Sequence, residues 1–307
     1  MTTMEHAEIG VMGGSGLYSM DGLKDVVQVE IDTPFGRPSD AFTIGNIHGV
    51  RIAFLPRHGK GHRYLPSEVP TRANIYAFKK LGVKWLISVS ACGSLREDYR
   101  PGDIVVPSGV FDHTNGRSST FFSEGCVAHV SVAEPFCPVL SQALYGAVQA
   151  AFKSGATGVP GSRVHRGGNL IVINGPRFST KTESLLYRQW GMDLVNMTTA
   201  PEAFLAKEAE IAYAVMNHVT DYDCWHETEE AVTVEKVIQI LLTNVKLAQA
   251  AISDLVHALN VPNGPTLTSP SWSALKDALL TRSVACPVDT RRRLAFLLDK
   301  YWGKAVY

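Results

Sequence analysis

The stretch Ile9-Gly-Val-Met-Gly-Gly-Ser-Gly16 begins as a short apolar strand and runs directly into a glycine-rich turn. Apolar strands that end in a polar turn recur at VRIAFLP (50–56), WLISVSA (85–91) and IAYAVMNHV (211–219), and helical patterns such as residues 68–81 lie between strands. Strands that alternate with helices predict an α/β fold with a mixed, mostly parallel central sheet flanked by helices. No shift in composition divides the chain. We therefore expect a single domain over residues 1–307, with 288–307 as an unassigned C-terminal extension.

Three segments predict local structure that bears on this fold. Apolar residues recur at helical spacing from Val234 to Leu259, which predicts one long amphipathic helix. Residues 154–168 are rich in Gly, Ser and Arg and predict an exposed loop. Residues 272–280 predict a short helix, which follows a linker at 261–271.

Composition and charge exclude several classes of protein. The 307 residues are 45% apolar and 19% charged, and 29 basic residues balance 29 acidic ones. A neutral chain is unlike the basic proteins that bind nucleic acids or anionic membrane surfaces. No apolar run approaches the roughly 18 residues of a membrane span, and the N-terminus lacks the pattern of a secretory signal. Five scattered cysteines fit reduced thiols. We expect a cytoplasmic protein, with a nuclear pool as an open alternative.

Polar and glycine residues gather where the predicted strands end. Gly13-Gly-Ser-Gly16, Arg57-His58, Ser90-Ala-Cys-Gly-Ser94 and Asn196-Met-Thr-Thr199 each follow an apolar strand. Each group alone is explained equally well as a structural turn. Together they predict an anion site, because ligands of α/β proteins bind beyond the carboxyl ends of the strands, where amides, hydroxyls and arginines suit phosphate.

Two carboxylates follow the strand 211–219, in the sequence Thr220-Asp-Tyr-Asp223. Asp221 and Asp223 point the same way if the strand continues through them. A desolvated carboxylate has a raised pKa and can act as a general acid. A turn or helix cap explains the pair about as well. The cysteines and histidines show no spacing typical of metal ligands, so no metal is expected.

Ten ordered motifs extend this interpretation across roughly residues 8–287. They are GVMGGSGL, DTPFGRPSD, PRHGKGH, ACGSLRED, PGDIVV, AEPFCP, NGPRFS, WGMDLVNMT, PEAFLAKEAEIAYA and TDYDCWHETEEAVTVEKV. With them the chain resembles the trimeric purine nucleoside phosphorylase family, and within it the members that act on 5′-methylthioadenosine. The resemblance implies phosphorolysis of an N-glycosidic bond to give adenine and 5-methylthioribose 1-phosphate, in purine and methionine salvage. Inorganic phosphate would be a co-substrate and no cofactor would be needed.

The resemblance also implies roles for individual residues. Phosphate would be bound by Ser15, Arg57, His58, Ser90, Ala91 and Thr198. The nucleoside would be bound by Phe178, Ser179, Asn196, Met197, Asp221, Tyr222, Asp223, Val234, Val237, His62 and His129. Asp221 would protonate purine N7 and Asp223 would accept a hydrogen bond from the 6-amino group. His129 would enter the site of a neighbouring subunit, which implies a homotrimer with shared active sites.

Several positions bear on which substrate the chain prefers, and they leave alternatives open. Relatives that act on 6-oxopurines have Asn at the position of Asp221, so the aspartate favours adenine. Ser15 and Ser90 stand where close relatives have Thr, and Ala285 stands where a bulkier apolar residue is common near the 5′ substituent. The alternatives are a 6-oxopurine nucleoside phosphorylase, a hydrolytic methylthioadenosine nucleosidase and a non-catalytic nucleoside-binding module.

Overall fold

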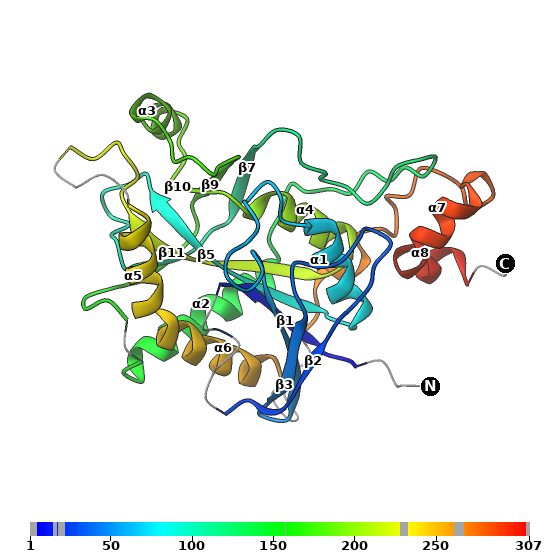
Figure 1. Ribbon diagram of the computed structural model, residues 1–307, viewed down its shortest axis with the longest axis horizontal. Helices are drawn as coiled ribbons and strands as arrows, with labels where there is room; N and C mark the ends of the chain where they lie inside the picture. The colour runs from blue at the N-terminus through cyan, green and yellow to red at the C-terminus, as the bar shows by residue number, and fades with distance from the viewer. Residues whose placement is uncertain are drawn as a thin grey trace.

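The central strand of the sheet is β5 (Trp85–Ser94), which pairs with three other strands (Figure 1). The structure is a computed structural model and describes residues 5–14, 17, 22–156, 158–227, 233–260 and 267–304. β1 (Ile9–Gly13) and β11 (Ala212–Asp221) run parallel to β5, and β10 (Leu194–Asn196) is antiparallel to its end. The buried side chains of β5 and β11 explain their position, because central parallel strands are covered on both faces.

The rest of the sheet extends from these strands in both directions. The remaining strands are β2 (Lys24–Val29), β3 (Phe42–Ile47), β4 (Val50–Pro56), β6 (Ile104–Val106), β7 (Gly109–His113), β8 (Val164–Arg166) and β9 (Asn169–Ile173). Among the described residues, six of the ten strand pairs are parallel. The predicted mixed, mostly parallel sheet is therefore confirmed.

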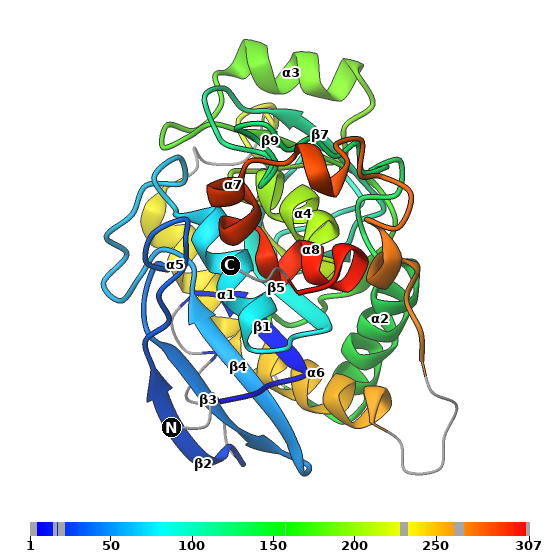
Figure 2. The same cartoon turned by 90° about the vertical axis from the view of Figure 1, so that its right-hand side faces the viewer.

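Helices cover both faces of the sheet (Figures 1 and 2). Met12 and Val11 are neighbours in β1 but belong to different apolar clusters, so the two clusters lie on opposite faces. One cluster includes α1 (Thr71–Lys80), α4 (Thr199–Glu208) and α8 (Ala295–Trp302). The other includes α2 (Pro138–Lys153) and α6 (Val245–Leu259). Three further helices are α3 (Lys181–Gln189), α5 (Val234–Thr243) and α7 (Val288–Arg293).

The three local predictions are wrong in part. The helix predicted over 234–259 divides into α5 and α6 at Asn244, whose buried amide accepts from Val159 N at 3.2 Å and donates to Gly102 O at 3.3 Å. β8 lies inside the loop predicted over 154–168, because its backbone pairs with β6. Residues 270–273 form a short 3-10 helix, and no α-helix follows over 272–280.

The C-terminal segment packs into the domain. Leu294, Leu297 and Leu298 are buried in the same cluster as α1 and α4. The Tyr76 hydroxyl donates to Arg293 O at 3.1 Å, and Lys300 Nζ donates to Glu210 Oε2 at 2.8 Å. Residues 288–304 thus complete one face of the core. No helix in the described part of the chain is long and apolar enough to cross a bilayer.

Candidate active site at the strand ends

The ends of β4, β5 and β10 bring most of the predicted phosphate ligands together. β1 pairs with both β4 and β5 in parallel, so the carboxyl ends of these strands meet. Ser90 Oγ lies 3.5 Å from Thr198 Oγ1, and Asn196 Nδ2 lies 3.5 Å from Ser90 Oγ. Thr198 is the residue before α4, yet its side chain makes no capping hydrogen bond, so its hydroxyl is not used by the helix. Ser15 lies outside the described residues.

Arg57 enters this cluster as a buried ion pair. Its Nε donates to Glu202 Oε1 at 2.5 Å, and both side chains are almost fully buried. Nη2 donates to Ser88 Oγ at 2.5 Å and to Met12 O at 3.2 Å, and Nη1 donates to Val89 O at 3.0 Å. A guanidinium has five N–H groups, so among the described residues at most one, on Nη1, is left for phosphate.

Two histidines lie beside Arg57. The rings of His58 and His62 stack with centroids 4.3 Å apart. Burial, and then the Arg57 charge, lower the pKa of His58 to about 4. His58 is therefore neutral at pH 7, and its Nδ1 donates to Tyr64 O at 2.9 Å because a carbonyl can only accept. Its Nε2 is an acceptor in that tautomer.

The two aspartates meet through a turn. β11 ends at Asp221, and Asp223 has a positive φ of 51°. The expectation that a continuing strand aligns them is therefore wrong. Asp223 N instead donates to Asp221 Oδ1 at 2.8 Å, and Thr220 Oγ1 donates to Asp221 Oδ2 at 2.6 Å. Gly93 makes room for the pair, because a Cβ there would lie 2.9 Å from Asp221 Oδ1.

The Asp223 side chain is buried. Burial raises the pKa of Asp223, and the nearby hydroxyls of Ser184 and Ser179 oppose that rise only in part. Asp223 Oδ2 and both hydroxyls are buried, and none of the three has a well-formed hydrogen bond to a residue that the structure describes. Buried polar groups without hydrogen bonds lower the stability of the folded protein, unless a bound ligand supplies the missing partner. Phe178, next to Ser179, is 40% exposed and available for stacking on a flat ring.

Other predicted residues support the site or lie away from it. Asn196 Nδ2 donates to Thr199 Oγ1 at 2.7 Å, which fixes the turn after β10. Met197 Sδ approaches Gly175 so closely that a Cβ there would lie 2.5 Å away. The Tyr222 hydroxyl donates to Glu97 O at 3.2 Å, in a cluster with Trp225.

Four other predicted site residues lie at exposed or partly buried positions. Val234 is 58% exposed at the start of α5, and Val237 is partly buried. Ala91 is partly buried on β5, beside Ser90. His129 is exposed, and its backbone N–H donates to Ala278 O at 2.8 Å. Within the described residues, no hydrogen bond or ring contact joins His129 to the other predicted site residues.

Sequence reasoning missed four polar residues that support the site. Glu202 pairs with Arg57, Ser88 binds both of them, and Ser184 lies beside Asp223. Glu202 could have been noticed as a lone carboxylate among the apolar residues of 201–206. The fourth is Arg117, which appears in a polar loop sequence that gives no signal. The described residues contain no group of three or more His, Cys, Asp or Glu side chains that could hold a metal.

Comparisons with known proteins identify the family of this chain. Residues 8–257 match the phosphorylase superfamily. An S-methyl-5′-thioadenosine phosphorylase of Chloroflexus aurantiacus is 53% identical over 98% of this chain and 100% of that protein. One of Gloeobacter violaceus is 52% identical over 96% of each chain. The chain belongs to the S-methyl-5′-thioadenosine phosphorylase family.

Solved structures of this family share the fold. A methylthioadenosine phosphorylase from an antarctic soil metagenomic library superposes with a TM-score of 0.89, at 45% identity over 96% of this chain and 100% of that one. The methylthioadenosine phosphorylase of Schistosoma mansoni in complex with adenine has a TM-score of 0.76, at 36% identity over 84% of this chain and 93% of that one. The family membership therefore rests on both sequence and fold.

Proposed function

We propose that this chain catalyses phosphorolysis of 5′-methylthioadenosine to adenine and 5-methylthioribose 1-phosphate, and accepts adenosine as a second substrate. The observation that carries the proposal is the pairing of two unlike sites along β5. Ser90 and Thr198 form a hydroxyl cluster beside the Arg57–Glu202 pair, and Gly93 adjoins the buried aspartates. Relatives with the same fold are methylthioadenosine phosphorylases, one of them bound to adenine.

The proposed reaction uses both the phosphate cluster at Ser90 and the aspartates beside Gly93. A phosphate oxygen bonds to the ribose anomeric carbon as the bond from that carbon to purine N9 breaks, and the bonding electrons pass to the purine. Phosphate near the anomeric carbon stabilises the positive charge of the transition state. Asp221 delivers a proton to N7, and Asp223 accepts from the 6-amino group. Because His58 Nε2 is an acceptor, we assign it to a protonated phosphate oxygen.

The assembly and location belong to the same proposal. We infer a homotrimer in which His129 of one subunit reaches the 5′ pocket of the next, which fits its exposed position away from its own site. The cytoplasm is the expected compartment. Light scattering of the purified protein should give three times the 33.4 kDa of one chain.

The deciding experiment measures free adenine from 5′-methylthioadenosine at increasing phosphate concentrations. We expect saturable release that vanishes in phosphate-free buffer, with one 5-methylthioribose 1-phosphate for each adenine. Release at the same rate without phosphate would mean a hydrolytic nucleosidase. Thermal stabilisation by the nucleoside without turnover would mean a binding module, and preferred release of hypoxanthine from inosine would mean a 6-oxopurine phosphorylase.

A further inference from the structure

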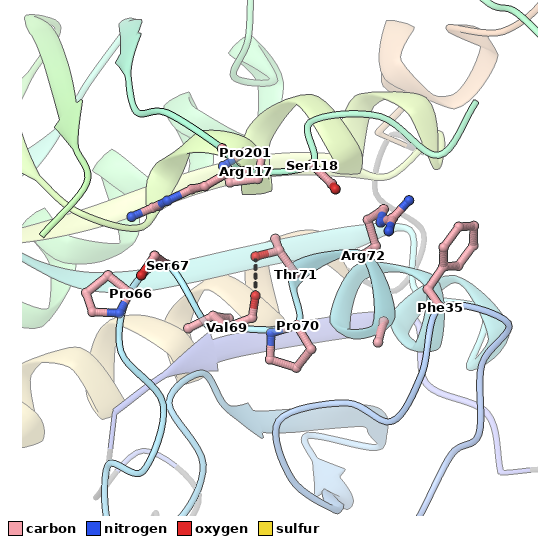
Figure 3. A pocket seen from close by; sticks show the side chains of 12 residues that line it. Phe35, Pro66, Ser67, Val69, Pro70, Thr71, Arg72, Arg117, Ser118 and Pro201 are labelled. Carbon is pink, nitrogen blue, oxygen red and sulfur yellow. Dashed lines mark hydrogen bonds between the residues drawn. The ribbon is translucent and has the colours of Figure 1, made fainter. Parts of the chain in front are cut away.

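Arg117 is a half-buried cation beside the phosphate cluster. It lies in none of the ten family motifs. It follows β7 and lines a cavity of about 230 Å³ together with Pro66, Ser67 and Pro201 (Figure 3). None of the predicted site residues lines this cavity. The guanidinium nevertheless reaches the turn that carries Thr198. Arg117 therefore links this cavity to the turn that carries Thr198.

The hydrogen bonds of Arg117 within the described part of the chain all go to backbone carbonyls. Nη1 donates to Met197 O at 2.7 Å and to Ala200 O at 2.9 Å. Nη2 donates to Asn174 O at 2.7 Å, just past the end of β9. Met197 and Ala200 flank Thr198, and Ala200 has non-helical dihedral angles inside the first turn of α4. One planar side chain thus fixes the irregular turn from which the Thr198 hydroxyl projects.

Neither Arg57 nor His58 supplies net positive charge beside this turn. The Arg57 guanidinium is matched by the Glu202 carboxylate at 2.5 Å, and His58 is neutral at pH 7. Among the described residues, Arg117 has no carboxylate within 4 Å, although Asp112 and Glu202 act on it from farther away. An arginine stays protonated even when burial lowers its pKa, as it does here. Arg117 also helps to lower the pKa of His58, which places its charge close to the phosphate cluster.

We infer that Arg117 is a positioning residue of the phosphate site, which holds the Met197–Ala200 turn by two carbonyls and supplies to the anion a positive charge that forms no ion pair with a described carboxylate. The inference rests on the proposed function, since it needs phosphate at Ser90 and Thr198. A purely structural arginine would hold the same carbonyls, but its charge would have no effect on phosphate or on His58. The test must therefore distinguish the effect of the Arg117 charge from the effect of its hydrogen bonds to the turn.

Three variants make that separation. Arg117→Gln removes the charge, and Arg117→Lys keeps the charge but loses the planar fork. Arg72→Gln is the matched control, because Arg72 lines the same cavity and stacks over Phe35 at 5.1 Å without acting on His58. Circular dichroism and the unfolding midpoint check that each variant folds.

Steady-state kinetics give the first readout. We expect Arg117→Gln to raise the KM for phosphate by about tenfold or more, while the KM for the nucleoside changes less than about threefold. Arg117→Lys should raise the phosphate KM by about threefold, and Arg72→Gln should leave both constants within about twofold. Equal changes in the two KM values, or a phosphate KM in Arg117→Gln that matches Arg72→Gln, overturn the inference. If the glutamine variant does not fold, the split between the two KM values in Arg117→Lys decides.

The His58 imidazole gives a second readout that needs no turnover. In the wild type, its ¹⁵N shifts should stay those of a neutral ring between pH 5 and 8, because its pKa is about 4. In Arg117→Gln the pKa of His58 should rise slightly, seen as a small shift of its titration midpoint below pH 5, because burial and the Arg57 charge, the stronger causes of the low pKa, remain. Arg72→Gln should leave that midpoint unchanged. A His58 titration that is unchanged in Arg117→Gln overturns the electrostatic part. Failure of the proposed function appears separately, as phosphate-independent turnover of the wild type.

Discussion

Replacing His218 with Met should stabilise the protein, and increasingly so as the pH falls. His218 lies on β11 and is 1% exposed, and neither ring nitrogen has a hydrogen-bond partner among the described residues. Burial alone lowers its pKa from 6.5 to about 4. Methionine has a similar volume and no polar atom that needs a partner, so the substitution removes a desolvation cost without leaving a large cavity.

The size of the effect follows from the pKa. In the unfolded chain the imidazole takes up a proton below about pH 6.5, while the folded protein excludes it until about pH 4. The folded pKa is depressed, so the wild type loses stability as the pH falls through this window. The full loss is about 3 kcal/mol below pH 4, and about 2 kcal/mol is already lost at pH 5.

The assay is guanidinium unfolding of wild type and His218→Met at matched protein concentration, at pH 7.5 and pH 5. Subtracting the two free energies of unfolding cancels groups that titrate in both proteins, such as His58 and Glu208. We expect the advantage of the variant to grow by about 2 kcal/mol between the two pH values. Met216→Leu, on the same face of β11, is the control and should show no pH-dependent difference. An advantage of His218→Met that is equal at both pH values refutes the reasoning.

Three further predictions concern the site and a buried acid, Glu208, at the end of α4. Asp221→Asn should lower turnover of adenine nucleosides by about a hundredfold or more, the usual scale for a lost general acid, and should relatively favour 6-oxopurines; unchanged adenine release from 5′-methylthioadenosine would exclude Asp221 as the acid. Burial raises the pKa of Glu208 to about 7, so its contribution to stability is lost as the pH rises from 4.5 to 7. Glu208→Gln should therefore gain up to about 3 kcal/mol over wild type between pH 4.5 and 8, seen as a pH-dependent difference in unfolding free energy. Ala285→Leu should increase the preference for 5′-methylthioadenosine over adenosine, and His129→Ala should lower kcat/KM for adenosine more than for 5′-methylthioadenosine. If the ratio of the two kcat/KM values is the same in both variants and the wild type, this account of the 5′ pocket is wrong.

The order of strands and helices could be predicted because it depends on local pattern. The predicted apolar strands at 50–56 and 85–91 correspond to β4 and β5. The break at Asn244 could not be predicted, because the amide is held by Gly102 and Val159, which are far away in the sequence. The same holds for β8, whose partner strand lies about 60 residues earlier.

The site was predictable by residue type but not by contact. The sequence places Arg57, Ser90 and Thr198 at strand ends, and parallel pairing then brings them together. It does not show that Glu202, Ser88 and two backbone carbonyls take four of the five N–H groups of Arg57. Nor does it show that Arg117 reaches the turn around Thr198 from a loop about 80 residues away. Both contacts depend on tertiary distances that no local pattern encodes.

The separation between the two halves of the site is set by β5 itself. Ser90 adjoins the phosphate cluster and Gly93 adjoins the aspartates, three residues farther along the same strand. At a rise of about 3.3 Å per residue, these positions lie about 10 Å apart, which leaves room for one ribose between a phosphate and a purine. A buried central strand cannot lengthen or slip without losing its pairing to β1 and β11. Under the proposed function, the pairing of this strand would therefore set the distance between the phosphate nucleophile and the purine leaving group.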